Sequence, residues 1–160
     1  MKSRNRLVLM VWLTLVASTC LSVPSSAQKN EVAALSARIA ELNRAGKYAE
    51  AIPLAQRQLE SLEKANGPFN RDVAAALNNL ALLYGDQGND IEAEPLCKRS
   101  IAILEKVYGL DSSEVAPELN NLAALYQRQG RYAEAEPLFK RALALREKSL
   151  PREHPDIGQS

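Results

Sequence analysis

Apolar residues from position 77 onward recur at intervals of three and four, which predicts amphipathic helices rather than strands. The first run consists of Leu77, Leu80, Ala81 and Tyr84. The second run consists of Ala93, Leu96, Cys97, Ser100 and Ile101. Between the runs lies a short polar segment with Gly88, a residue that can adopt positive φ after a helix end. The pattern therefore predicts two antiparallel helices joined by a tight turn.

This unit is repeated. Residues 77–101 and 119–143 read LNNLALLYGDQGNDIEAEPLCKRSI and LNNLAALYQRQGRYAEAEPLFKRAL, identical at 16 of 25 positions, and Gly130 takes the place of Gly88. A fixed period of this length is typical of an array in which one supersecondary unit stacks on the next. Extended alternating runs of Val, Ile and Thr are absent from the sequence, so we expect an all-α fold with little or no sheet.

The spacing L-x-x-L-A-x-x-Y, eight residues, A-x-x-x-F resembles the tetratricopeptide repeat (TPR). The matching residues are Leu77, Leu80, Ala81, Tyr84, Ala93, Leu119, Leu122, Ala123, Tyr126, Ala135, Phe139 and Ala142. The 42-residue period and the LNNLA…EAEPL motif are most similar to those of the kinesin-light-chain-like subclass of this family. The resemblance implies a right-handed superhelical stack of about three antiparallel helix pairs.

The repeats are expected at about 29–66, 70–109 and 112–150, with the start of a further one at 153–160. The first is degenerate, with helices expected near 30–44 and 48–65. Arg38 stands there in place of Leu80 and Leu122, as a polar terminal unit would show. Asn70 or Asp72 is positioned to cap the first helix of the second repeat.

Pro53, Pro95 and Pro137 recur about five residues into the second helix of each repeat. An interior proline normally costs about 3 kcal/mol, so we expect these helices to begin loosely or to bend there.

The first 27 residues have the order of a secretory signal peptide. Lys2, Arg4 and Arg6 precede an apolar run over 7–16, and Pro24 leads to small residues that favour cleavage after Ala27. The alternative is an uncleaved N-terminal membrane anchor, although a membrane-spanning helix needs about 20 apolar residues and this run is shorter. We therefore expect residues 28–160 to form a TPR domain that is exported, either periplasmic or secreted, without stable membrane insertion.

Charge argues against nucleic acid as a partner. Removing residues 1–27 leaves 17 Lys and Arg against 19 Asp and Glu, and the two signs alternate along the predicted helices. Cys97 would then be the only cysteine; it fills the place of Phe139 one repeat later, which favours a small buried residue. The alternative is an exposed thiol that links two chains.

The sequence offers little for catalysis. His154, the single histidine, belongs to an expected turn, and no Cys/His cluster has metal-ligand spacing. The glycines are single and periodic rather than grouped in a phosphate loop. We expect no enzyme activity, no metal and no cofactor.

Two adjacent asparagines in the middle of each predicted first helix are locally unfavourable and therefore informative. The TPR resemblance implies that Asn78 and Asn120 face the concave groove and bind the backbone of a peptide, with Asn79 and Asn121 nearer the seam between repeats. Gln127 and Arg128 would flank the groove, together with Leu82 and Ala124. The alternative is that the amides only bridge neighbouring helices.

These patterns predict a module that binds a protein or peptide through its concave face. The apolar side of the last helix, taken as Leu138, Ala142 and Leu145, would have no neighbour. Either the array continues, so that this is an accessory or assembly domain of a longer or enzyme-fused protein, or this face mediates self-association.

Overall fold

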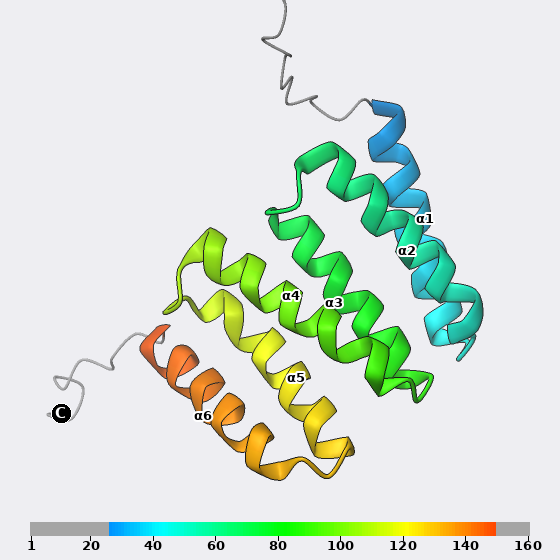
Figure 1. Cartoon of the computed structure of the whole chain (residues 1–160). Coiled ribbons are helices and arrows are strands. Elements are labelled where there is room, and N and C mark those ends of the chain that lie inside the picture. Colours follow the sequence, from blue (N-terminus) through cyan, green and yellow to red (C-terminus); the bar gives the residue numbers. More distant parts are fainter. Residues whose placement is uncertain (1–25, 150–160) are drawn as a thin grey trace, which may run out of the picture.

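The computed structural model describes residues 26–149, which form six α-helices and one 3-10 turn. They are α1 Ser26–Arg44, α2 Tyr48–Asn66, α3 Arg71–Asp86, α4 Asp90–Tyr108, the turn η1 Ser113–Val115, α5 Ala116–Arg128 and α6 Tyr132–Ser149. Figure 1 shows three antiparallel pairs, α1–α2, α3–α4 and α5–α6, laid one after another in chain order. The expected right-handed TPR stack is confirmed.

Small residues allow the two helices of a pair to approach closely. Ala81 and Ala123 in the first helices are 2% and 0% exposed, and Ala93 and Ala135 in the second helices are buried as well. Leu77 and Leu119 are completely enclosed beside them. The buried residues form one continuous core that runs through all three repeats.

The turn within each pair depends on glycine, as expected. Gly46, Gly88 and Gly130 have φ of 67°, 84° and 74°, a region that side chains with a Cβ rarely adopt. The start of α3 is fixed by Asn70, whose side chain accepts a hydrogen bond from the backbone N–H of Asp72 at 2.8 Å. Asn70, rather than Asp72, is therefore the cap.

Some local expectations need adjustment. α1 begins at Ser26 rather than near residue 30, so cleavage after Ala27 would fall within its first turn. Pro53, Pro95 and Pro137 lie inside uninterrupted helices. The backbone N–H groups of Glu50 and Ala51 already bond to the carbonyl of Lys47 at 3.1 Å, so α2 does not begin loosely. The expected further repeat at 153–160 and His154 lie outside the described residues.

The prediction for the uncovered side of α6 was wrong. Ala142 and Leu145 are 1% and 6% exposed, and Leu138 packs partly against the core. The exposed large hydrophobic residues of α6 are instead Tyr132, Phe139 and Leu143, at 65%, 37% and 57%. A rotation of less than half a helical turn separates the face of α6 that packs inside a repeat from the face that would meet a next repeat, and the period alone did not distinguish the two. None of the helices within residues 26–149 is both long and apolar enough to cross a bilayer.

Candidate binding surface

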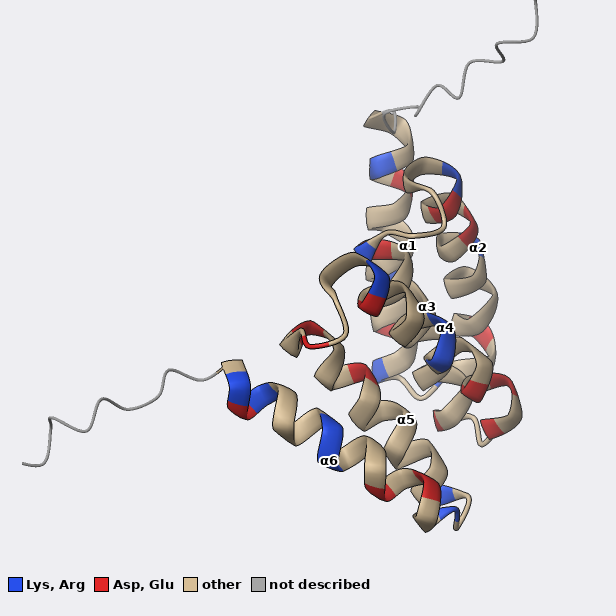
Figure 2. Cartoon of the chain, turned by 60° about the vertical axis from the view of Figure 1, so that its left-hand side comes forward, with Lys and Arg blue, Asp and Glu red and all other residues tan. Residues whose placement is uncertain are grey.

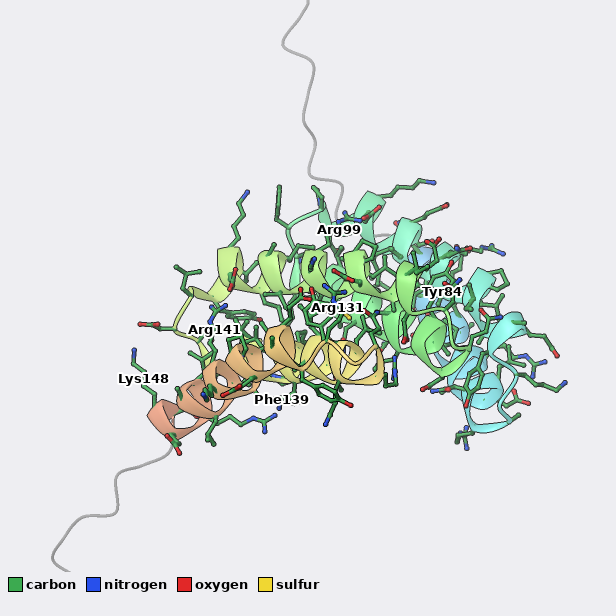
Figure 3. The ribbon with its side chains drawn as sticks, turned by 60° about the horizontal axis from the view of Figure 1, so that its bottom comes forward. Tyr84, Arg99, Arg131, Phe139, Arg141 and Lys148 are labelled. Atoms are coloured by element: carbon green, nitrogen blue, oxygen red, sulfur yellow. The ribbon has the colours of Figure 1, made fainter. Side chains whose placement is uncertain are left out.

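The first helices of the second and third repeats, α3 and α5, lie closer together than the second helices of the same repeats, α4 and α6. The Asn121 amide on α5 donates a hydrogen bond to the Asn78 amide oxygen on α3 at 2.9 Å. The second helices are instead bridged by long side chains, Arg99 to Glu63 at 2.5 Å and Arg141 to Glu105 at 2.6 Å (Figure 3). Two short amides span one side of the stack and arginine–glutamate pairs the other. This difference indicates that α1, α3 and α5 line the inner side of the curve.

The solvent side of α3 and α5 includes several small and amide side chains. On α3 the exposed positions include Ala75, Asn79 and Leu82, and on α5 they include Pro117 and Ala124. Leu82 is 41% exposed and is the largest apolar group among them. We call the exposed side of α1, α3 and α5 the inner surface. On α3 and α5 these exposed positions carry short side chains, whereas the exposed side of α1 also carries Arg38, Glu41 and Arg44.

The structure places Asn121 in the seam between repeats, as expected, but places Asn78 and Asn79 differently from the sequence argument. Asn78, expected to face the groove, is half-buried and held in the seam by Asn121. Asn79, expected nearer the seam, is exposed on the inner surface. In the second repeat the bridging role therefore falls to Asn78, and the amide facing solvent is Asn79.

Asn120 lies on the side of α5 that faces away from the preceding repeat and is half-buried. With its amide turned so that the oxygen points toward α6, that oxygen lies 2.7 Å and 3.2 Å from the two terminal guanidinium nitrogens of Arg146. Asn120 thus borders both the inner surface and the last helix.

The side chains of Gln127 and Arg128, although adjacent in the sequence, point in different directions. Gln127 is exposed and lines a hollow of about 300 Å³ with residues of α6. Arg128 reaches back over the end of α3 to Asp90, with nitrogen and oxygen 2.8 Å apart. This path needs Gly85, because a Cβ there would lie 2.3 Å from a guanidinium nitrogen of Arg128.

A polar network between the second and third repeats was missed by the sequence argument. Glu94 accepts hydrogen bonds from Lys98 at 2.6 Å, from Arg131 at 2.6 Å and from the Tyr126 hydroxyl at 3.0 Å. Hydrogen bonds from Lys98 and Arg131 lower the pKa of Glu94 to about 2. The EAEPL motif is identical in both repeats, so the sequence did not reveal that the two equivalent glutamates have different environments. Only one of them is covered by a following repeat.

Cys97 is a packing residue. It is 3% exposed, and burial raises the pKa of its thiol to about 11, so very little thiolate forms at neutral pH. This favours the small buried residue that its repeat position indicated. The acidic and basic segments alternate along the helices and do not gather into a stripe of one sign (Figure 2).

Helix pairs that stack through small interlocking residues define the class of helical solenoid repeats. A family model described as Tetratricopeptide repeat matches residues 31–106, 72–148 and 115–159. The chain belongs to the tetratricopeptide repeat family. Domains of this family typically act as non-catalytic modules that bind other proteins.

Solved structures share this fold. BtubC (BKLC) from P. vanneervenii superposes with a TM-score of 0.69 at 21% identity, covering 81% of this chain and 54% of that one. The TPR domain of Arabidopsis FLU gives a TM-score of 0.67 at 18% identity, covering 76% and 99%. A putative kinesin light chain from Podosopora anserina with TPR-like repeats gives 0.65 at 23% identity, covering 81% and 59%.

The chain therefore spans little more than half of the BtubC and Podosopora structures. The expected likeness to kinesin-light-chain-type repeats is confirmed at the level of the fold. Among curated proteins, none is detectably similar to this chain in sequence.

Proposed function

We propose that this protein is an exported, non-enzymatic adaptor whose inner surface binds an extended segment of another protein. The observation that carries the proposal is the close approach of α3 and α5 through Asn78 and Asn121. This contact leaves the neighbouring Asn79 exposed beside Leu82. An amide offers one donor and one acceptor group, which matches the alternating groups of a peptide backbone.

The composition of the inner surface is suited to a partner segment that carries few charges. Alanines and one exposed leucine give apolar contact, and Arg128 is already engaged by Asp90. Binding would then draw on many small contacts to a preformed surface rather than on one deep pocket. The proposal includes no nucleic acid, metal or cofactor.

Export is proposed from the N-terminal sequence alone. Positive residues, an apolar run and small residues before Gln28 follow the order of a cleaved leader. Mass spectrometry of the protein recovered from the cell envelope or medium should find an N-terminus at Gln28. An intact N-terminus in the membrane fraction would support the anchor instead.

A pull-down from cell-envelope extract tests the adaptor function, with wild-type protein beside two alanine variants. Asn79→Ala with Asn120→Ala removes amides that border the inner surface, whereas Asn121→Ala removes only the donor to Asn78. We expect the double variant to remain folded and to lose a partner that the wild type retains. Asn121→Ala should lower stability by about 0.5–1.5 kcal/mol and retain the partner.

If the double variant keeps every partner while folded, binding does not use these amides and the inner-surface assignment is wrong. If it loses its helical circular dichroism, the asparagines are structural. A second double variant, Asn78→Ala with Asn120→Ala, removes the two asparagines that the sequence argument placed in the groove, one of which lies in the seam between repeats. It should be destabilised through Asn78 as well as impaired in binding through Asn120.

A further inference from the structure

The last helix carries an exposed stripe that differs from its counterparts in the other repeats. Glu136, Phe139, Leu143 and Arg146 follow one another at intervals of three, four and three, so they share one face of α6. All four are exposed, with Phe139 at 37% and Leu143 at 57%. We call these four residues the α6 stripe.

In the earlier repeats the same positions are covered by the helix pair that follows. The counterparts on α2 and α4 are Ile52, Ala55, Leu59 and Leu62, and Glu94, Cys97, Ile101 and Leu104. Seven of these eight are buried, and Glu94 is held by the hydrogen bonds of Tyr126 and Arg131. The α6 stripe is therefore a docking position of the fold.

The stripe does not match a further helix pair of the usual kind. Leu62 and Leu104 are 9% and 5% exposed under the next repeat, and α6 has Arg146 at this place. Covering Arg146 in the same way would bury a charge whose described partner is only the neutral amide of Asn120, which is costly. The occupant must supply an acid opposite Arg146, and a base opposite Glu136 would add to the ion pair that Glu136 makes with Lys140.

A second copy of the stripe that runs in the opposite direction supplies both of these charges. Glu136 and Arg146 lie five residues on either side of position 141, and Phe139 and Leu143 lie two residues on either side. An antiparallel second copy would therefore place Arg146 on Glu136 at both ends and Leu143 on Phe139 in the middle. The spacing is that of the contact positions of an antiparallel helix pair.

We propose that a second copy of this chain docks on the α6 stripe, with the two α6 helices antiparallel about a twofold axis at the level of residue 141. The interface is isologous, so each contact occurs twice. The side chain of Arg141 does not obstruct the axis, since it turns toward α4 and pairs with Glu105 at 2.6 Å. Figure 3 shows Phe139 on α6 away from this arginine.

A head-to-tail arrangement fits less well. It would place the outer side of α1 on the α6 stripe, and α1 carries Arg38 where the other first helices insert Leu80 and Leu122. Arg38 pairs with Glu41 at 2.7 Å and is half exposed. The outer side of α1 is thus a polar end, and Arg38 would meet the apolar middle of the stripe.

Charge reversal tests both the dimer and its register. By sedimentation velocity over a range of concentrations, the wild type should show a monomer–dimer equilibrium. Glu136→Arg and Arg146→Glu should each weaken it by about tenfold or more, because each creates like-charge pairs at both ends. Mixing the two single variants should restore association as a heterodimer, and the double variant Glu136→Arg with Arg146→Glu should again dimerise with itself.

Lys148→Glu is the matched control. It makes the same charge change as Arg146→Glu on another side of α6, where Lys148 pairs with Asp111 at 2.8 Å, and should leave association unchanged. A wild type that stays monomeric throughout would overturn the proposal and favour another occupant of the stripe. Self-association that the single variants do not weaken, or that mixing does not restore, would overturn this register. Arg146 bonds to Asn120 at the border of the inner surface, whereas Glu136 has no described contact with that surface, so the Glu136→Arg result does not depend on the pull-down.

Discussion

At the scale of single residues, position within the array decides what a repeated side chain does. Glu94 and Glu136 occupy the same place in successive repeats and both pair with a lysine four residues later. Only Glu94 also receives hydrogen bonds from Tyr126 and Arg131 of the next repeat. The same glutamate therefore joins two repeats in one case and lies on the surface in the other.

This difference predicts a pH-dependent stability. The pKa of Glu94 falls from 4.5 to about 2 on folding, so its stabilisation is complete above pH of about 4.5 and is lost as the pH falls toward 2. Glu94→Gln should lower the free energy of unfolding by about 1–2 kcal/mol at pH 7, with a much smaller loss near pH 2.

Urea unfolding at the two pH values provides the measurement, and Glu136→Gln is the control. Its carboxylate is exposed and, within one chain, is paired with Lys140 alone among the described contacts, so little change is expected at protein concentrations low enough to keep the protein monomeric. Equal losses of unfolding free energy in the two variants would show that the hydrogen bonds of Glu94 to Tyr126 and Arg131 add nothing to stability.

At the scale of helices, the pair depends on alanine where the backbones approach. Ala123 is fully buried, whereas the adjacent Ala124 is exposed on the inner surface. Ala123→Leu should destabilise the protein by about 1–3 kcal/mol because the extra atoms force α5 and α6 apart. Ala81→Leu should act in the same way between α3 and α4.

Ala124→Leu makes the same chemical change one residue away and should be nearly neutral in thermal unfolding. Leucine has almost the helix propensity of alanine, so the comparison isolates packing from propensity. Similar melting temperatures for Ala123→Leu and the wild type would contradict the interlock described for the core.

At the scale of the whole molecule, each repeat is stabilised mainly by its neighbours. The central pair α3–α4 packs against repeats on both sides, and the α1–α2 and α5–α6 pairs each pack against one. Amide hydrogen exchange should therefore be slowest in the central pair and faster in α1 and α6. Dilution should accelerate exchange in α6 further if the twofold dimer forms.

Mass spectrometry of exchanged peptides at two protein concentrations measures both effects. Loss of protection along all six helices at one rate would indicate that the array opens as a single unit. Protection of α6 that is independent of concentration would argue against a dimer that covers the α6 stripe.

The repeat, the helix pair and the turns could all be predicted from the sequence. A 42-residue period, alanines at interlocking positions and a glycine after each first helix are local signals, and each corresponds to a local physical requirement. Burial of Cys97 also followed, because its position is apolar in the next repeat.

The different roles of residues that repeat in the sequence could not be predicted in this way, because they depend on packing between repeats. Whether Asn78 or Asn79 faces solvent, and whether Leu145 or Leu143 is uncovered on α6, depends on rotations of less than half a helical turn. A sequence period places residues on a helix but does not fix the direction from which the next helix approaches. That direction is set by packing between repeats, where side chains such as Asn121, Tyr126 and Arg131 reach across from the following unit.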